Sequence, residues 1–211
     1  MNKDFDYCFK IIIIGECGVG KTSLLIKYVD NTFGDQKSTI GVDFKMKTVC
    51  VKLKNGLTKI VKLQIWDTGG QERHQALVKT YCRHAQGALF VYAVNDYGTF
   101  EKIPQWIDLI NKTDDTHILV RYLVGNKTDL GIAVPKDQRE NLCREHNMEF
   151  IQTSACTGNS VDKLFEDMAK KLTENCMQID TQIDKADVVM PQILDLDGNK
   201  PAQKSCCGGT N

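Results

Sequence analysis

Two patterns of hydrophobic and polar residues, one typical of strands and one typical of helices, alternate along most of the chain. Short apolar runs bounded by turn residues are typical of strands buried on both faces of a parallel sheet. They predict strands over residues 8–14, 87–94, 118–124 and 149–152. Apolar residues spaced three and four apart predict helices over residues 21–30, 99–110, 135–146 and 160–172.

One stretch departs from this succession of buried strands and helices. Residues 42–53 and 58–67 alternate between apolar and polar positions, and Asn55-Gly56 between them is typical of a tight hairpin turn with positive φ angles. We therefore predict an α/β fold with a doubly wound, six-stranded, mostly parallel sheet, one antiparallel edge strand and helices on both faces. Ligands of such sheets bind outside the carboxyl ends of the strands.

The pattern predicts one folded domain over residues 1–175 and a flexible tail over residues 176–211. Residues 177–211 hold three lysines, five aspartates and two prolines, and residues 188–196 are a candidate docking segment. In the whole chain 27 basic residues balance 27 acidic ones, so charge gives no attraction to nucleic acid. The nine scattered cysteines form no Cys-x-x-Cys pair, and no secretion signal opens the chain; both favour a reducing, cytosolic environment.

The first chemical motif lies between a predicted strand and a predicted helix. It has the spacing of a phosphate-binding loop: Gly15-Glu16-Cys17-Gly18-Val19-Gly20-Lys21-Thr22. Glycines let the backbone N–H groups converge on phosphate, helped by the N-terminus of the following helix, which continues with Ser23. Lys21 would bridge the β- and γ-phosphates and Thr22 would ligate Mg²⁺. The alternative is a glycine-rich turn with a chance lysine, but the strand–loop–helix context favours a P-loop NTPase.

A second motif, Trp66-Asp67-Thr68-Gly69-Gly70-Gln71-Glu72, ends another strand. Asp67 is placed to hold Mg²⁺, usually through a bound water. The N–H of Gly70 would contact the γ-phosphate, and Gln71 would orient the attacking water.

The third motif, Asn126-Lys127-Thr128-Asp129, predicts which base is bound. The Asp129 carboxylate would accept hydrogen bonds from the ring N–H and the exocyclic amine of guanine, a donor pair that adenine lacks. Asn126 would support the base edge and the stem of Lys127 would pack on the ring. After the last strand, Thr153-Ser154-Ala155 would bring the Ala155 N–H to the guanine oxygen.

With these motifs the chain resembles the Ras superfamily of small GTPases over residues 8–174, and within it the Rab branch. The strings that carry the Rab resemblance are Ser38-Thr39-Ile40-Gly41-Val42-Asp43-Phe44, Lys62-Leu63-Gln64-Ile65-Trp66-Asp67-Thr68 and Tyr81 ahead of Arg83. The resemblance implies a regulator of vesicle-mediated membrane traffic that cycles between GTP and GDP with Mg²⁺ and hydrolyses GTP slowly without an activating protein.

The resemblance also implies roles for single residues. Thr39 would be the second hydroxyl ligand of Mg²⁺, Phe33 would flank the base, and Ser154 and Cys156 would adjoin it. Phe44, Trp66 and Tyr81, together with Ile40, would contact effector proteins. These aromatic residues could instead be simple core packing, and that alternative stays open at this point.

The implied partners are effectors, an exchange factor, an activating protein and an escort protein that handles prenyl groups. The paired Cys206 and Cys207 resemble the geranylgeranylated cysteines of Rab proteins, although four residues follow them; the alternative is an unmodified tail. A doubly lipidated tail would hold a monomeric protein on the cytoplasmic face of intracellular membranes, from which it cycles into the cytosol.

Two other functions compete with this interpretation. An ATP-using phosphotransferase would share the phosphate-binding loop, but Asp129 argues against it. A GTP-binding scaffold without turnover would fit the segment between Phe33 and Thr39, which has five residues where the family usually has six. Gln71 and Thr39 argue against this function.

Overall fold

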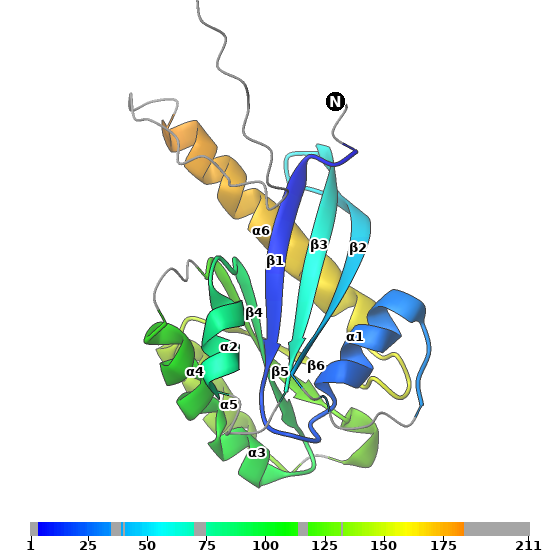
Figure 1. Ribbon diagram of the computed structural model, residues 1–211, viewed down its shortest axis with the longest axis vertical. Coiled ribbons are helices and arrows are strands. Elements are labelled where there is room, and N and C mark those ends of the chain that lie inside the picture. The colour runs from blue at the N-terminus through cyan, green and yellow to red at the C-terminus, as the bar shows by residue number, and fades with distance from the viewer. Residues whose placement is uncertain are drawn as a thin grey trace, which may run out of the picture.

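The protein folds around one six-stranded sheet with the strand order β2-β3-β1-β4-β5-β6 (Figure 1). The computed structural model describes residues 4–34, 39, 41–69, 75–113, 118–131 and 133–183. The strands are β1 Tyr7–Ile14, β2 Val42–Lys52, β3 Thr58–Thr68, β4 Gly87–Ala93, β5 Val120–Asn126 and β6 Glu149–Gln152. Only the pairing of β2 with β3 is antiparallel; the other four strand pairs are parallel. The predicted fold class is confirmed.

Helices cover both faces of this sheet. They are α1 Lys21–Asp30, α2 Gln75–Cys82, α3 Tyr97–Glu101, α4 Ile103–Asn111, α5 Lys136–Glu145 and α6 Val161–Ile183, with a short 3₁₀ helix, η2, at Thr128–Leu130. In β1, Ile11 and Ile13 pack with α1 and α6, whereas Ile12 and Ile14 pack with α2, α3, α4 and α5. All four isoleucines are fully buried, which explains why this strand reads as a continuous apolar run.

Two predicted helices differ in their bounds. The helix predicted over residues 99–110 is two helices that meet at Lys102, with Asp96 capping the first by accepting a hydrogen bond from the Gly98 N–H. Pro104 explains the break, because it has no N–H to donate to a carbonyl one turn earlier. Pro135 precedes α5 as its N-cap instead of standing inside its first turn.

The prediction for the last helix was wrong about its end. Helix α6 continues to Ile183, so residues 176–183, which were assigned to the flexible tail, are helical. Cys176 and Met177, both on α6, pack against the core, and these contacts support the extra turns. Residues 184–211, including the candidate docking segment at 188–196, lie outside the described residues. No helix in the described part of the chain is long and apolar enough to cross a membrane.

The hairpin turn and the fifth strand were predicted with small errors. At the turn only Gly56 has a positive φ, 85°, so the connection is not the two-residue turn that needs positive φ at both Asn55 and Gly56. Strand β5 begins and ends two residues later than predicted, which places Asn126 on its last position.

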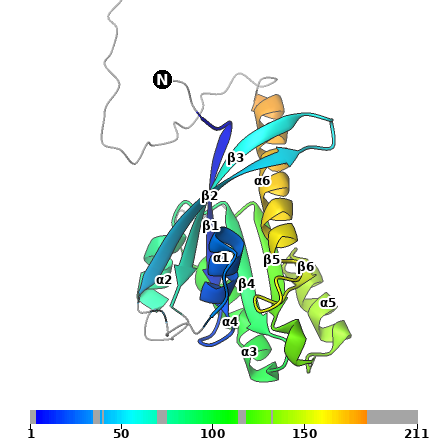
Figure 2. The same ribbon diagram turned by 90° about the vertical axis from the view of Figure 1, so that its right-hand side faces the viewer.

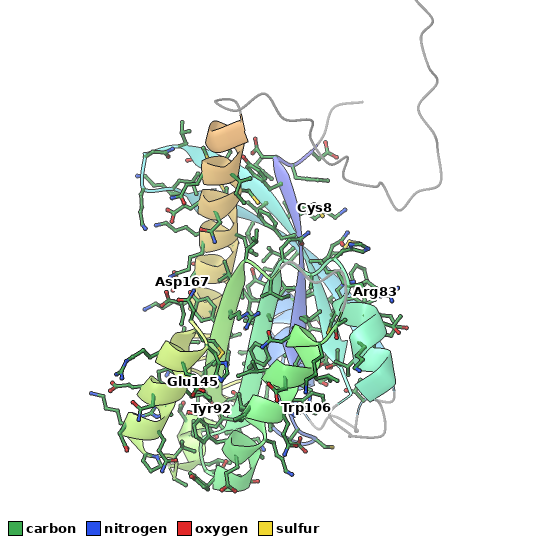
Figure 3. The ribbon with its side chains drawn as sticks, turned by 90° about the vertical axis from the view of Figure 1, so that its left-hand side faces the viewer. Cys8, Arg83, Tyr92, Trp106, Glu145 and Asp167 are labelled. Carbon is green, nitrogen blue, oxygen red and sulfur yellow. The ribbon has the colours of Figure 1, made fainter. Side chains whose placement is uncertain are left out.

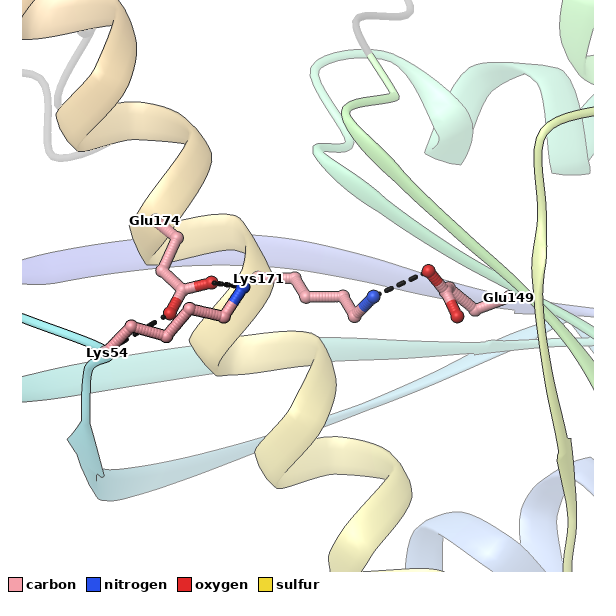
Figure 4. A network of polar contacts seen from close by, with 4 residues as sticks. All are labelled: Lys54, Glu149, Lys171 and Glu174. Carbon is pink, nitrogen blue, oxygen red and sulfur yellow. Dashed lines mark hydrogen bonds and ion pairs between the residues drawn. The ribbon is translucent and has the colours of Figure 1, made fainter.

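At the end of the sheet away from the strands' carboxyl ends, the last turns of α6 stand beside the β2–β3 hairpin (Figure 2). Exposed ion pairs link these elements: Lys54 in the hairpin lies 3.4 Å from Glu174, and Lys171 lies 2.6 Å from Glu149 of β6 (Figure 4). The four side chains line a shallow groove of about 400 Å³.

Candidate nucleotide-binding site

The phosphate-binding loop predicted from the sequence joins the end of β1 to the start of α1. Gly15 has a φ of 149°, and a Cβ there would lie 2.1 Å from the carbonyl oxygen of Val91 in β4. Gly20 has a φ of 94°, and a Cβ there would lie 2.5 Å from Nδ2 of Asn126. Only glycine fits at these two positions, since the loop is pressed against β4 on one side and against Asn126 on the other.

Lys21 lies beneath this loop in the first turn of α1. Its Nζ donates hydrogen bonds to the carbonyl oxygens of Gly15, at 2.8 Å, and Glu16, at 2.7 Å. Burial of the ammonium group lowers the pKa of Lys21 to about 8, while the nearby Asp67 carboxylate acts in the opposite direction. A buried cation of this kind is suited to an anionic ligand that enters the loop.

The predicted magnesium ligands come together beside Lys21. Thr22 and Thr39 place their hydroxyl oxygens 2.7 Å apart, and both donate to Oδ2 of Asp67, the Thr39 bond being 3.3 Å long. Asp67 is fully buried. Burial raises the pKa of its carboxyl group, and hydrogen bonds from Thr22 and the charge of Lys21 oppose that rise.

This cluster fits Mg²⁺. The second carboxylate oxygen of Asp67, Oδ1, is buried and has no hydrogen-bond partner among the described residues. Neighbouring oxygen ligands of an octahedral Mg²⁺ at 2.0–2.1 Å lie about 3 Å apart, close to the separation of the two threonine hydroxyls. A cation held here through a bound water would give this buried oxygen a hydrogen-bond donor.

The predicted base-recognition residues are linked by Asn126 at the end of β5. Its Nδ2 donates to the carbonyl oxygen of Val19 at 2.9 Å, and its Oδ1 accepts from the Thr153 hydroxyl and the Ala155 N–H, each at 3.2 Å. The Ala155 N–H, which we expected to reach guanine, is therefore bonded to Asn126 here. Asn126 ties the phosphate-binding loop to the loop that follows β6.

Asp129 lies in η2 with its carboxylate exposed, as a base acceptor requires. The Ser154 hydroxyl donates to Oδ1 of Asp129 at 2.5 Å and itself accepts from the Thr157 N–H at 3.1 Å, which fixes the carboxylate beside the loop. Lys127 takes a positive φ of 68° to turn the chain from β5 into η2. Cys156 is exposed at the same edge, and Ser23 is partly buried in the first turn of α1.

The three aromatic residues of the predicted effector surface form one stack. The ring centroids of Phe44 and Trp66 lie 4.7 Å apart, and those of Trp66 and Tyr81 lie 5.4 Å apart. Phe44 is exposed and the other two are half-buried, so the stack is partly open to solvent. Phe33 is 52% exposed at the end of α1. Ile40, Gly70, Gln71, Cys206 and Cys207 lie outside the described residues.

Sequence reasoning missed one residue that contacts the phosphate-binding loop. Trp106, on α4, donates from Nε1 to Oε1 of Glu16 at 2.9 Å. Trp106 lies at a position that helical spacing predicts to be in the core. Nothing in that spacing indicates that it bonds to Glu16, 90 residues earlier.

Comparisons with known proteins show the family to which the chain belongs. The model of the Ras family matches residues 10–174. The chain belongs to the Ras family. It is 38% identical to the Ras-related protein Rab-1 of Theileria parva over 97% of this chain and 92% of that protein. It is also 42% identical to Rab-18 of Lymnaea stagnalis over 78% of this chain and 80% of that protein, and 39% identical to Rab-13 of Canis lupus familiaris over 82% and 83%.

As a Ras-family member with Rab relatives, the chain is a Rab-like small GTPase that binds GTP and GDP with Mg²⁺. Regulation of vesicle traffic is the known role of the Rab family, whose members work with effectors, exchange factors and activating proteins. Rab proteins are generally associated with intracellular membranes. The functions expected from the sequence are confirmed at this family level.

Proposed function

We propose that this Rab-like GTPase reports its bound nucleotide through Thr39 and Gln71 and hydrolyses GTP with the residues of the predicted site. The observation that supports this most directly is the convergence of the Thr22 and Thr39 hydroxyls on Oδ2 of the buried Asp67, whose other oxygen, Oδ1, has no donor among the described residues. Thr39 precedes β2, outside the phosphate-binding loop, so a site that includes it couples that segment to what the loop holds.

Each residue has a distinct task in hydrolysis. Lys21 exchanges its bonds to the Gly15 and Glu16 carbonyls for bonds to phosphate oxygens. Thr22 and Thr39 would hold Mg²⁺ directly and Asp67 would hold it through water; the bound ion would supply charge neutralisation for the phosphates. Gln71 orients the water that attacks in line, and the Gly70 N–H bonds the γ-phosphate. When that phosphate leaves, Thr39 and Gly70 lose their contacts and both segments relax.

The remaining nucleotide contacts come from the two base loops and from residues beside the phosphate-binding loop. Asp129 selects guanine, Asn126 and Lys127 support the base, and Phe33 flanks it. The phosphate chain and the base are further contacted by Gly15, Glu16, Cys17, Gly18, Val19, Gly20, Ser23, Ser154, Ala155 and Cys156. The stack of Phe44, Trp66 and Tyr81, with Ile40, presents the effector surface.

The partner proteins and the membrane complete the cycle. The sequence of the active site supplies no obvious arginine finger, so an activating protein would provide one and raise the rate by about 10³–10⁵. Cys206 and Cys207 carry prenyl groups delivered with an escort protein, and two lipid chains suffice for stable attachment to the cytoplasmic face of an intracellular membrane.

Single-turnover hydrolysis tests the catalytic proposal. We expect Gln71→Leu to keep GTP affinity and to slow hydrolysis by about tenfold or more, because the attacking water loses its orienting group. Equal rates in the variant and the wild type would favour the scaffold function instead.

Two further measurements test the other assignments. GTP should displace labelled GDP while ATP should not, and displacement by ATP would contradict the role of Asp129. Mass spectrometry of the C-terminal peptide from cells should show two prenyl groups on Cys206 and Cys207, and an unmodified peptide would refute the membrane anchor.

A further inference from the structure

The phosphate-binding loop has few side chains that could fix its shape. Residues 15–20 include three glycines, and Cys17 is exposed. The two side chains that do reach into the protein are Val19, which is fully buried, and Glu16, which is half-buried. A loop of this composition needs outside contacts to hold one conformation.

Glu16 is held at both of its ends. Its carbonyl oxygen accepts the hydrogen bond from Lys21 Nζ at 2.7 Å, and its carboxylate accepts the hydrogen bond from Nε1 of Trp106 at 2.9 Å. Trp106 is only 3% exposed and is packed in the core on the α4 side of the sheet. It lies in the same half of the molecule as Tyr92 of β4, far from Cys8 at the start of β1 (Figure 3).

The helix that carries Trp106 also packs with α2, the helix that follows the Gln71 motif in the sequence. Val78 and Cys82 of α2 belong to the same apolar cluster as Trp106, and α2 begins at Gln75, four residues after Gln71. A hydrogen bond from a rigid, buried indole to a carboxylate is one of the stronger single contacts in a protein. It connects the phosphate-binding loop to the helix layer that includes α2.

We infer that Trp106 is a positioning residue for nucleotide binding, which acts through Glu16 to fix the phosphate-binding loop and Lys21. The inference rests on the proposed function. The group that the loop binds is the diphosphate of the guanine nucleotide. Binding it requires that the loop N–H groups already point toward one place. Loss of the contact lets the loop open and speeds nucleotide release, while the core around α4 stays in place.

Release of a fluorescent GDP analogue into excess unlabelled GDP, in the presence of Mg²⁺, tests the inference. Trp106→Phe keeps an aromatic ring but removes the donor together with part of the buried indole, whereas Glu16→Ala removes the acceptor and leaves the core untouched. We expect each to speed release by about five- to tenfold, and the double variant to be no faster than the faster single variant. Glu16→Gln, which keeps an acceptor oxygen, should restore most of the wild-type rate.

Tyr97→Phe is the matched control. It removes another aromatic side-chain hydrogen bond, that of the Tyr97 hydroxyl to Oε1 of Gln138 at 2.7 Å, away from the phosphate-binding loop. Its release rate should equal that of the wild type. If Trp106→Phe and Glu16→Ala release GDP at the wild-type rate, or if their effects multiply in the double variant, this inference is overturned and the proposed function stands. A wild-type chain that does not retain GDP would overturn the proposed function and this inference with it.

Tryptophan fluorescence provides a second readout that a purely structural role would not move. The chain has two tryptophans, so Trp66→Phe leaves Trp106 as the only one. We expect the emission of Trp106 to shift when EDTA strips the nucleotide, and the shift to disappear when Glu16→Ala is added. A shift that survives Glu16→Ala would show that Trp106 senses the nucleotide by another route and would overturn the inference.

Discussion

The two ends of the sheet use charge in opposite ways. At the carboxyl ends of the strands, Lys21 and Asp67 are buried, and one oxygen of Asp67 has no donor among the described residues. At the other end, Lys54 and Glu174 pair across the solvent-exposed groove beside α6. Buried polar groups cost free energy unless they are fully bonded, whereas exposed pairs contribute little. A ligand that bonds the buried groups at the first end therefore stabilises the protein. The exposed ion pair at the second end contributes little to stability.

The largest expected effect comes from removing the buried cation. Lys21→Met should lower the affinity for GDP by about 100-fold or more, because the phosphates lose a charged donor in a site shielded from water. Isothermal titration calorimetry measures this directly. Lys54→Met, the same substitution at the exposed end, should leave the affinity unchanged, and a comparable loss there would contradict the contrast between the two ends.

Stability should show the same contrast. Asn126→Ala should lower the free energy of unfolding by about 2–3 kcal/mol, because Val19, Thr153 and Ala155 each lose a buried hydrogen-bond partner. Lys171→Met, which breaks the exposed pair with Glu149, should cost less than about 1 kcal/mol. Urea unfolding compares them, and equal costs would mean that burial does not decide the value of these contacts.

Ligand binding should also change the alkylation rates of the exposed cysteines differently at the two ends of the sheet. Cys17 and Cys156 are exposed beside the nucleotide site, and Cys50 is exposed on β2. GDP with Mg²⁺ at ten times its Kd should slow alkylation of the first two by about tenfold and leave Cys50 unaffected. Peptide mass spectrometry after timed iodoacetamide treatment reads all three sites. Protection of Cys50 as well would indicate a change that spreads across the whole sheet.

The smallest expected effect lies at the start of β1. Asp6 accepts hydrogen bonds from the Ile60 N–H and from Lys59, and these lower the pKa of its carboxyl group. A lowered pKa in the folded state means that Asp6 stabilises the protein above about pH 4, and that this contribution is lost as the pH falls through the lowered value. Asp6→Ala should therefore be slightly less stable at pH 7, and the difference should shrink as the pH falls below about 4. A difference that does not change with pH would contradict this.

The sequence predicted best those features in which local pattern and chemistry agree. The four isoleucines of β1, the glycines after them and the apolar face of α1 all specify the same strand–loop–helix unit, and its bounds were nearly correct. Pro104 also carries a local signal, but helical spacing on both sides concealed the break at Lys102. The end of α6 was missed because Cys176 and Met177 become informative only when the core they contact is known.

Contacts between distant residues could not be predicted. Asn126 bonds to Val19, 107 residues earlier, and Trp106 bonds to Glu16, 90 residues earlier. Periodicity identifies which residues face the core but does not identify their partners. The family motifs predicted which residues contact the nucleotide, whereas the structure showed which residues hold those predicted residues in place.

The position of Asn126 has a consequence for the order in which a newly made chain matures. The three segments that it joins are completed far apart in time during synthesis, since Val19 is made early and Ala155 comes near the end of the domain. Ribosomes add about 5–20 residues per second, so the phosphate-binding loop waits several seconds for its last support. A chain still attached to the ribosome can thus complete its predicted guanine-binding loops only after β6 has emerged, and α6, which completes the core, follows later still.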